Sequence, residues 1–430
     1  MVEPSSDALN CQVIQTRVHV LGHWIAQAME GLRGVEYLPE PTDRRIVSAV
    51  DPTVVGFQNE WRSEIMGWAP IPVEPVVRAR RRTPSVAGIV VFALLVSASL
   101  LMWQNQWIVV ELPLPQSEWA FEETGIRGLQ DDGLNGDGVR VCMVDTGIDV
   151  EHEAFTDSRI QFKDMVGGSV SPVDYGAVAH GTLMAGLLLS TDHQSGSAPN
   201  VSFAMVAALQ DNGEGENTGL DSDVARAIRW CQFDFEADII SLSLGGSQGQ
   251  GRSVEGDSSS ATRQATDAGV YVVAAAGNDG LDDDGDVASP GSVSLAISVG
   301  ATTKSGELWE NSSIGSSTDD RGELRAFPNQ KPEVVAPGHR IVSAGDANLW
   351  YSSSGTSDST VFVTGTLALL LEANPLLKPS ESGSSDCLVK VKKALAQSLQ
   401  MEGSSHDLRG GYGMLDAQAW YDNTQAISAC

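Results

Sequence analysis

Three short, glycine-containing stretches of this 430-residue chain hold an acid, a base and a hydroxyl nucleophile. Asp145 is followed by Thr-Gly, His180 is followed by Gly-Thr, and Ser357 is preceded by Gly-Thr. A serine hydroxyl is a weak nucleophile at neutral pH, so it needs a base within hydrogen-bond reach, and that base needs a carboxylate to fix its tautomer. The three residue types therefore suit nucleophilic catalysis at Ser357.

The elements around these residues predict how they are positioned. Asp145 directly follows the apolar run Val141–Val144, and His180 opens a helical stretch. From about Ile126 to Ala417, apolar strand-like runs alternate with helical stretches, which predicts a parallel sheet covered by helices on both faces. In such α/β folds, active groups collect beyond the carboxyl ends of the strands.

The neighbours of these residues resemble the motifs of the subtilisin-like serine proteases, the subtilase family. The similar segments cover about 290 residues and read DTGIDVEH from Asp145, HGTLMAG from His180, SLSLGG (241–246), AAAGN ending at Asn278, GTS ending at Ser357, and GYGMLDA (411–417). This resemblance implies a subtilisin-like three-layer fold and an Asp145–His180–Ser357 triad.

The same resemblance implies further roles. Asn278 would donate its side-chain amide to the oxyanion, together with the backbone N–H of Ser357. The segment Ser243, Leu244, Gly245 and Gly246 would bind the substrate backbone as an added strand and help to form the specificity pocket. We expect a serine endopeptidase that acts on proteins or peptides through an acyl-enzyme on Ser357.

The segment after Ser357 departs from the family. Asp358, Ser359 and Val361 stand where the family usually has Met, Ala and Pro. An acidic side chain in a first helical turn suits the helix dipole, but beside the nucleophile it could raise the pKa of His180. A catalytically inactive subtilase-like domain that binds peptides or partners at the cell surface therefore stays as the alternative function.

Other sites have weaker signals. Asp282, Asp284 and Asp286 offer clustered oxygen ligands of the kind that calcium prefers, as do the acidic residues of 211–223. A solvated acidic loop and a structural calcium site both stay open, and the chemistry itself needs no cofactor. The remaining histidines considered as bases lie in no comparable glycine-rich helix entry; they are His152, His193, His339 and His406.

Charge and motifs exclude some classes of function. The chain has a formal net charge of −29, and nearly all of it lies after residue 84. Such a field repels nucleic acid, and we find no phosphate-binding loop, no metal-ligand histidine pair and no basic aromatic patch. We therefore expect no nucleic-acid partner.

One uncharged run predicts a membrane segment. Residues 85–103 contain no charge, which matches the roughly 20 apolar residues that cross a bilayer as a helix. Arginines precede the run and tryptophans end it, which predicts a cytoplasmic N-terminus. We expect four parts: a cytoplasmic region of unknown function (1–84), a transmembrane helix and interface (85–107), a juxtamembrane linker (108–125) and an extracellular peptidase domain (126–430). The alternative is the inverted topology, with the peptidase domain inside the cell.

The five cysteines are too few and too scattered to predict a disulfide framework. Cys142 lies inside the apolar run before Asp145 and is expected as a small buried hydrophobic residue. A bridge between Cys387 and Cys430 stays open, because spacing does not fix proximity. Stability is therefore not expected to depend on disulfides.

Overall fold

The computed structural model describes residues 12–13, 86–104, 116–156, 158–191, 193–246, 256–280, 285–319, 322–380, 383–399 and 405–427. The chain divides into two compact units. One comprises Met1–Thr16 with Leu114–Cys430, and the other comprises Arg17–Pro113. The expected catalytic residues all belong to the first unit.

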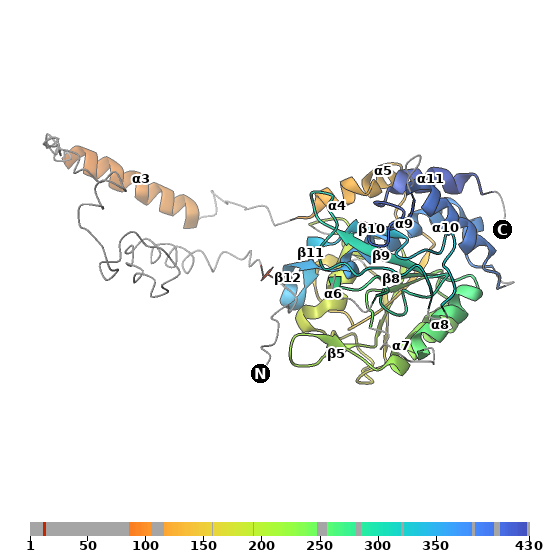
Figure 1. Cartoon of the computed structure of the whole chain (residues 1–430). Coiled ribbons are helices and arrows are strands. Elements are labelled where there is room, and N and C mark those ends of the chain that lie inside the picture. The colour runs from red at the N-terminus through yellow and green to blue at the C-terminus, as the bar shows by residue number, and fades with distance from the viewer. Residues whose placement is uncertain are drawn as a thin grey trace, which may run out of the picture. The chain divides into compact units, whose positions relative to one another are not determined.

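The second unit contains one described helix, α3 (Val86–Gln104), over the run for which a helix is predicted (Figure 1). Its described large apolar side chains are 41–69% exposed. A search of the described residues finds no helix with the length and apolarity needed to span a bilayer. The arginines at 78–82 and Trp107, which give the expected orientation, lie outside the described residues.

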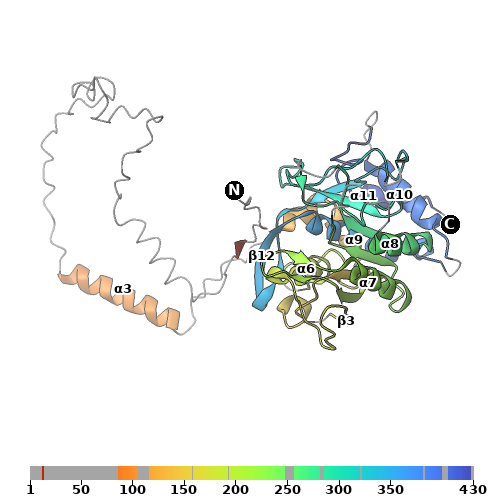
Figure 2. The ribbon, with the colours of Figure 1, turned by 60° about the horizontal axis from the view of Figure 1, so that its bottom comes forward.

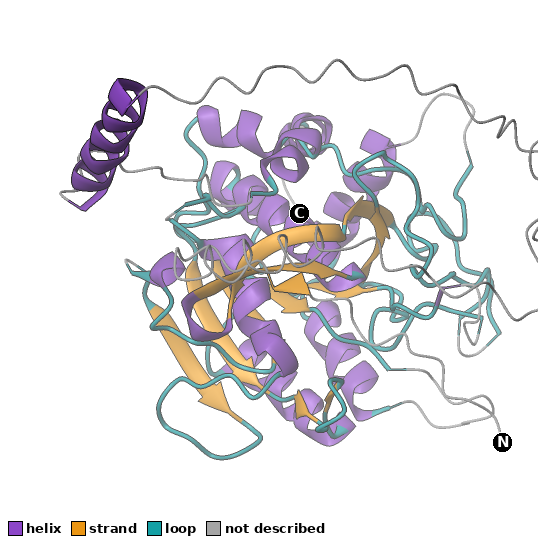
Figure 3. Ribbon diagram, turned by 90° about the vertical axis from the view of Figure 1, so that its left-hand side faces the viewer, coloured by secondary structure: helices purple, strands orange, loops and turns teal. Residues whose placement is uncertain are grey.

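The first unit is built on a seven-stranded, wholly parallel sheet, shown in orange between purple helices in Figure 3. The strand order is β10 (Val334–Pro337), β9 (Ile297–Thr302), β8 (Tyr271–Ala275), β7 (Ile239–Leu242), β2 (Arg140–Asp145), β4 (Ser202–Ala207) and β3 (Ile160–Asp164). The α/β fold with a parallel central sheet is therefore confirmed.

Alternate residues of the strands enter two separate cores, as the two-residue side-chain period of a strand requires. In β2, Val141 and Met143 join the larger core, and Cys142 and Val144 join the other. Helices α7 (Asp221–Phe233) and α8 (Asp257–Asp267) cover the second core. The larger core contains side chains of α4 (Glu118–Glu123), α5 (Ile126–Asp131), α6 (His180–Leu189), α9 (Thr356–Ala373), α10 (Asp386–Leu399) and α11 (Ala417–Gln425) (Figure 1).

The folded unit begins before the expected boundary at Ile126. The side chain of Phe121 in α4 is fully buried, and its ring lies 4.9 Å from that of Phe362 in α9. Residues near 120, which were expected in a juxtamembrane linker, are therefore part of the core.

A smaller antiparallel sheet leads to the expected nucleophile. It consists of β1 (Gln12–Val13), β12 (Leu349–Ser354) and β11 (His339–Gly345), and β12 ends directly before Gly355. The hydroxyl of Ser343 in β11 donates to the carbonyl of Leu183 in α6, and both ribbon views place β12 near α6 (Figures 1 and 2). A two-stranded ribbon, β5 (Gln210–Asp211) with β6 (Asn217–Thr218), lies in the acidic segment before α7.

A disulfide joins Cys142 in β2 to Cys231 in α7, across 89 residues of sequence. The expectation of an unpaired Cys142 was wrong, because the sheet and the helix that covers it bring together two apolar positions far apart in the chain. Cys387 is also disulfide-bonded. Cys430, the partner that the sequence left open, lies outside the described residues, so that pairing stays open.

Candidate active site

Asp145 and His180 form the acid–base pair that the sequence predicts. Asp145 is the last residue of β2, and its fully buried carboxylate accepts a 2.7 Å hydrogen bond from the backbone N–H of Thr146. His180 is the first residue of α6, and its Nδ1 lies 2.7 Å from Oδ1 of Asp145. With Nδ1–H held by this carboxylate, Nε2 is left as the basic atom.

A second aspartate, Asp174, ties the two segments together. Its Oδ1 accepts from the hydroxyl of Thr146 at 2.6 Å, and its Oδ2 accepts from both the N–H and the hydroxyl of Thr182 at 2.8 and 2.7 Å. Thr146 also accepts from the N–H of Gly181 at 2.8 Å. These bonds fix the residues next to Asp145 against the first turn of the helix that carries His180.

Two glycines make this close approach sterically feasible. A Cβ atom on Gly147, whose φ is +121°, would lie 1.9 Å from the carbonyl oxygen of Val173. A Cβ atom on Gly181 would lie 2.1 Å from the carbonyl oxygen of Gly147. Any side chain at either position would separate the segments, so the glycines of both motifs have a direct packing reason.

Ser357 lies in the first turn of α9, and its side chain is 8% exposed. Its hydroxyl donates to the carbonyl of Ser243 at 3.1 Å, and the hydroxyl of Ser243 donates to the carbonyl of Ser357 at 3.1 Å. A hydroxyl has one proton. The hydroxyl must therefore give up its bond to Ser243 before it donates to Nε2 of His180.

Asn278 is oriented by its neighbour Thr356. Its Oδ1 accepts from the N–H of Thr356 at 2.9 Å and from the hydroxyl of Thr356 at 3.0 Å. These bonds use the oxygen and leave the amide Nδ2 for other contacts. A Cβ atom on Gly355 would lie 3.5 Å from this Nδ2 and 3.6 Å from the backbone nitrogen of Ser357. The space beside Gly355 is therefore bordered by the two donors expected for an oxyanion.

Carboxylates dominate the electrostatics of the site. Burial opposes the charged form of His180, but the charges of Asp145, Asp358 and Asp174 outweigh it and raise the pKa of His180 to about 9. Burial raises the pKa of Asp358 to about 7, against the hydrogen bond from Ser353 and the charge of His180. The base thus faces three acidic side chains.

The predicted site residues, apart from Asp145 and the metal candidates, border a cavity of about 560 Å³. Its wall includes most of the residues singled out from the sequence, namely His180, Ser243, Leu244, Gly245, Gly246, Asn278 and Ser357, and also Asp358. Asp145 lies behind His180 rather than on the wall. The structure therefore brings the expected catalytic residues and the expected substrate-binding segment to one place.

The substrate-binding segment follows the end of β7 at Leu242. Gly246 exchanges two 3.0 Å backbone hydrogen bonds with Ser289, so both of its backbone groups are already paired. Gly245 packs closely on Ala288, since an added Cβ would lie 2.6 Å from the Cβ of that alanine. An added strand would therefore pair with the part of this segment before Gly246.

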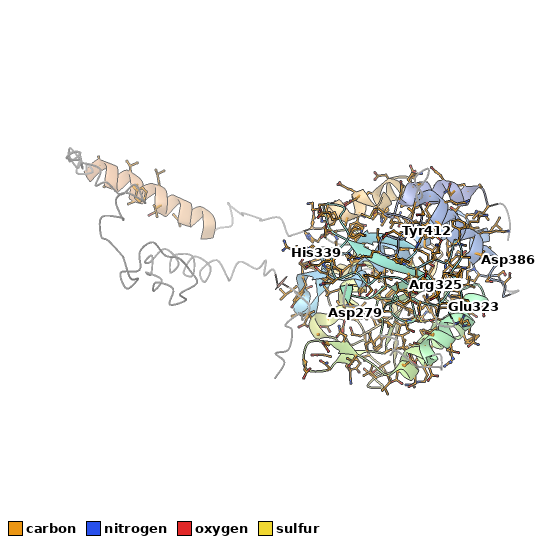
Figure 4. The ribbon with its side chains drawn as sticks, viewed as in Figure 1. Asp279, Glu323, Arg325, His339, Asp386 and Tyr412 are labelled. Atoms are coloured by element: carbon orange, nitrogen blue, oxygen red, sulfur yellow. A yellow bond between two sulfur atoms is a disulfide. The ribbon has the colours of Figure 1, made fainter. Side chains whose placement is uncertain are left out.

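Of the three aspartates named as calcium ligands, Asp286 lies within the described part of the chain. Both of its carboxylate oxygens are held by Arg325, at 2.6 and 2.7 Å (Arg325 is labelled in Figure 4), so Asp286 forms an ion pair. Asp282 and Asp284 lie outside the described residues. Over the described ranges, no three His, Cys, Asp or Glu side chains are grouped so as to hold a metal ion.

The competing histidines have other contacts. The ring of His152 accepts from the N–H of Ala154 at 3.1 Å and lies 3.2 Å from the carbonyl of Leu349. His406 Nε2 lies 2.8 Å from the carbonyl of Pro332. His193 and Trp350 form an edge contact, and His339, labelled in Figure 4, stacks on Trp309. His180 is the only one of these histidines that is hydrogen-bonded to an aspartate within the described residues.

Three residues that shape the site were not predicted from the sequence. Asp174 precedes His180 by six residues in a polar loop, and Ser353, whose hydroxyl donates to Asp358, is the second-last residue of β12. No motif in the sequence marks Asp174 or Ser353, because each acts through a hydrogen bond that exists only in the folded chain. The role of Thr356 could have been suspected, since it lies inside the Gly-Thr-Ser motif.

Known proteins match this chain over the same region. The model of the subtilase family matches residues 136–413. Serine protease AprX of Bacillus subtilis is 32% identical over 58% of this chain and 60% of its own length. An extracellular serine proteinase of a Thermus species is 35% identical over 62% and 60%. The chain thus spans about 60% of the length of these two relatives.

Shorter relatives and solved structures agree. Subtilisin DY of Bacillus licheniformis is 32% identical over 59% of this chain and 84% of its own length. A solved cold-adapted subtilisin-like serine proteinase is 28% identical and covers 66% of this chain and 90% of its own, with a TM-score of 0.51. The prenylagaramide maturation protease PagA has a TM-score of 0.55 at 24% identity, covers 70% and 98%, and supports the fold alone. Because the family model covers more than half of the chain and the motif residues meet in one cavity, this protein belongs to the subtilase family.

Proposed function

We propose that this protein is a serine endopeptidase that hydrolyses peptide bonds through an acyl-enzyme on Ser357. The observation that carries the proposal is the 2.7 Å hydrogen bond between His180 and the buried Asp145, at a cavity whose wall also includes Ser357. The relatives named as a serine protease and a serine proteinase support it.

In the proposed reaction, Nε2 of His180 takes the proton of Ser357 as its oxygen attacks the scissile carbonyl carbon. Asp145 holds the imidazole through Nδ1–H and stabilises the imidazolium that forms. The imidazolium then gives its proton to the leaving amine, and the carbonyl re-forms as an ester on Ser357. Water, deprotonated by His180, hydrolyses this ester and restores the free serine.

Negative charge develops on the carbonyl oxygen during both attacks. The amide Nδ2 of Asn278 and the N–H of Ser357 border the space beside Gly355, where this oxygen would be stabilised. Thr356 fixes the orientation of the amide before the substrate arrives. Donors that are already oriented need little rearrangement in the transition state, which is why they accelerate the reaction.

We propose protein or peptide substrates, because the cavity continues along Ser243 and Leu244, where an extended backbone can pair. Glu216 and Asn217 line the same cavity.

No step of this mechanism requires a cofactor.

The alternative function is a subtilase-like domain that binds peptides without cleaving them. Two observations favour it. The hydroxyl of Ser357 donates to Ser243 in this structure, and the carboxylate of Asp358 follows the nucleophile. Both features would have to be overcome during catalysis, so activity is the deciding measurement.

We propose further that α3 anchors the chain in a membrane, with the N-terminus cytoplasmic and the catalytic unit outside. The uncharged run 85–103 and the exposure of its apolar side chains support this proposal. The disulfide between Cys142 and Cys231 also suits an oxidising compartment.

One contact opposes this topology. Gln12 and Val13 pair with β12, which is incompatible with residues 1–84 on the other side of a membrane. Protease protection in intact cells separates the two arrangements. Tags at residue 1 and residue 430 with opposite accessibility support the anchor, and equal accessibility overturns it.

The function is tested with the full-length chain in detergent micelles. A fluorophosphonate probe and casein hydrolysis are applied to the wild type and to Ser357→Ala. Labelling and cleavage that both disappear in Ser357→Ala support the peptidase. A folded wild type that neither reacts nor cleaves supports the binding function instead.

A further inference from the structure

Asp358 is a buried acid beside the catalytic residues for which the triad mechanism has no role. It directly follows Ser357 in the first turn of α9, and its side chain is only 1% exposed. Burying a carboxylate is costly unless other groups compensate. It lies on the wall of the catalytic cavity together with His180 and Ser357.

The two oxygens of Asp358 face different neighbours. Oδ1 accepts a short hydrogen bond from the hydroxyl of Ser353, at the end of β12. Oδ2 borders the space beside Gly355, where an added Cβ would lie 3.7 Å from it. The same point lies 3.5 Å from Nδ2 of Asn278 and 3.6 Å from the N–H nitrogen of Ser357. One acceptor thus shares the oxyanion space with two donors.

Three carboxylates act on the charge of His180 in α6: Asp145 at the end of β2, Asp358 in α9 and Asp174 in the loop before α6. His180 and Asp358 line the same cavity. Asp145 is hydrogen-bonded to His180 directly, and Asp174 is fully engaged by threonines and a backbone N–H. Asp358, whose Oδ2 borders the oxyanion space, is therefore the one of the three that can respond to the reaction.

We propose that Asp358 is a positioning residue that sets the pH range of catalysis by controlling the protonation of His180. Its carboxylate stabilises the imidazolium, so the base stays protonated, and hence inactive, up to a higher pH than it would without Asp358. This inference rests on the proposed peptidase function and adds a residue to it.

The physical argument separates pH range from maximal rate. Before the reaction His180 must be neutral, and a neighbouring negative charge opposes that state. In the transition state the same charge stabilises the imidazolium but opposes the oxyanion, so the two effects partly cancel. Removing the charge should therefore move the acid limb of the pH profile and change the plateau much less. The charge of Asp358 helps to raise the pKa of His180, and the charge of His180 in turn lowers the pKa of Asp358 against the larger effect of burial, which agrees with this direction.

The test compares kcat/KM against pH for an uncharged peptide substrate in the wild type and in Asp358→Asn. The acid limb should move to lower pH by about one unit, the smaller end of the effect of a nearby charge. Between about pH 7, below which Asp358 is itself protonated, and the wild-type limb, the variant should be up to about tenfold faster. On the plateau at high pH, kcat/KM should change by a smaller factor than this.

A matched control removes one carboxylate far from the site. Asp422→Asn makes the same chemical change on α11, where the exposed Asp422 accepts only a 3.1 Å bond from Gln418 among the described contacts. Its profile should coincide with that of the wild type. If it moves as far as that of Asp358→Asn, the effect is one of overall charge and the proposal is wrong.

A second measurement does not need activity. In the full-length Ser357→Ala protein, the titration of His180 is followed by NMR of histidine labelled at Cε1, with His180→Gln to assign the signal. Adding Asp358→Asn should lower the His180 midpoint by about one pH unit, and Asp358→Ser should do the same if the asparagine variant does not fold. An unchanged midpoint overturns the proposal, whereas a shifted midpoint in an inactive wild type overturns only the peptidase function.

Discussion

The two halves of the catalytic site differ in how they are built. The acid–base half, with Asp145 and His180, is held by hydrogen bonds through Thr146, Asp174 and Thr182, and lies within the loop closed by the Cys142–Cys231 disulfide. The nucleophile half, with Ser357 and Asn278, lies outside that loop. Its serine hydroxyl donates to the carbonyl of Ser243, and an acid follows the nucleophile. The half that must keep its geometry is cross-linked, and the half that must rearrange contains the departures from the family.

The largest effect on kcat is expected when the nucleophile, its base or the supporting carboxylate is removed, which tests whether both halves are needed. Ser357→Ala, His180→Ala or Asp145→Asn should each lower kcat by about 1000-fold or more, because the three act as one unit. Casein or peptide hydrolysis measures the loss, and thermal unfolding checks that each variant is folded. Substantial activity in Ser357→Ala would mean that another residue is the nucleophile.

Within the nucleophile half, Asn278→Ala should lower kcat by about 100- to 1000-fold with a smaller change in KM, since its amide acts on the transition state. Thr356→Val removes one of the two hydrogen bonds that orient the amide, so it should also lower kcat, by a smaller factor. Steady-state kinetics of both variants measures this. Equal kcat in Asn278→Ala and the wild type would exclude Asn278 as an oxyanion donor.

The cross-link of the acid–base half is tested by Cys142→Ala with Cys231→Ala. A disulfide that closes an 89-residue loop should contribute about 4 kcal/mol to the free energy of unfolding. Denaturant unfolding measures the loss, and kcat at low temperature should stay close to that of the wild type. An unchanged unfolding midpoint would show that β2 and α7 are held by packing alone.

The smallest effect is expected for Asp174→Asn. The amide keeps one acceptor and loses the other, so either Thr146 or Thr182 is left without its partner. We expect a loss of about 1–3 kcal/mol in stability and about tenfold in kcat, with KM nearly unchanged. Asp223→Asn, at an exposed ion pair with Arg226, is the matched control and should change neither. If both variants behave alike, Asp174 does not position the triad.

The sequence correctly predicted those parts of the site whose position depends on residues close to them in the chain. Asp145 ends a strand and His180 begins a helix, as expected, because the apolar run and the glycine-rich helix entry determine both positions within a few residues. The disulfide, the ion pair of Asp286 with Arg325 and the anchoring by Asp174 were not predicted. Each joins residues that only the packed sheet and its helices bring together, so their spacing in sequence contains no information about them.

The space beside Gly355 has a consequence for inhibitor chemistry. Two donors and one acceptor, Asp358, border it. A boronic acid bound to Ser357 carries hydroxyl groups that can accept from Asn278 and donate to Asp358, so it would satisfy all three. A phosphonate oxygen has no proton to donate and would face the carboxylate as a like charge. Boronates should therefore be better affinity reagents for this protein than phosphonates of the same peptide sequence.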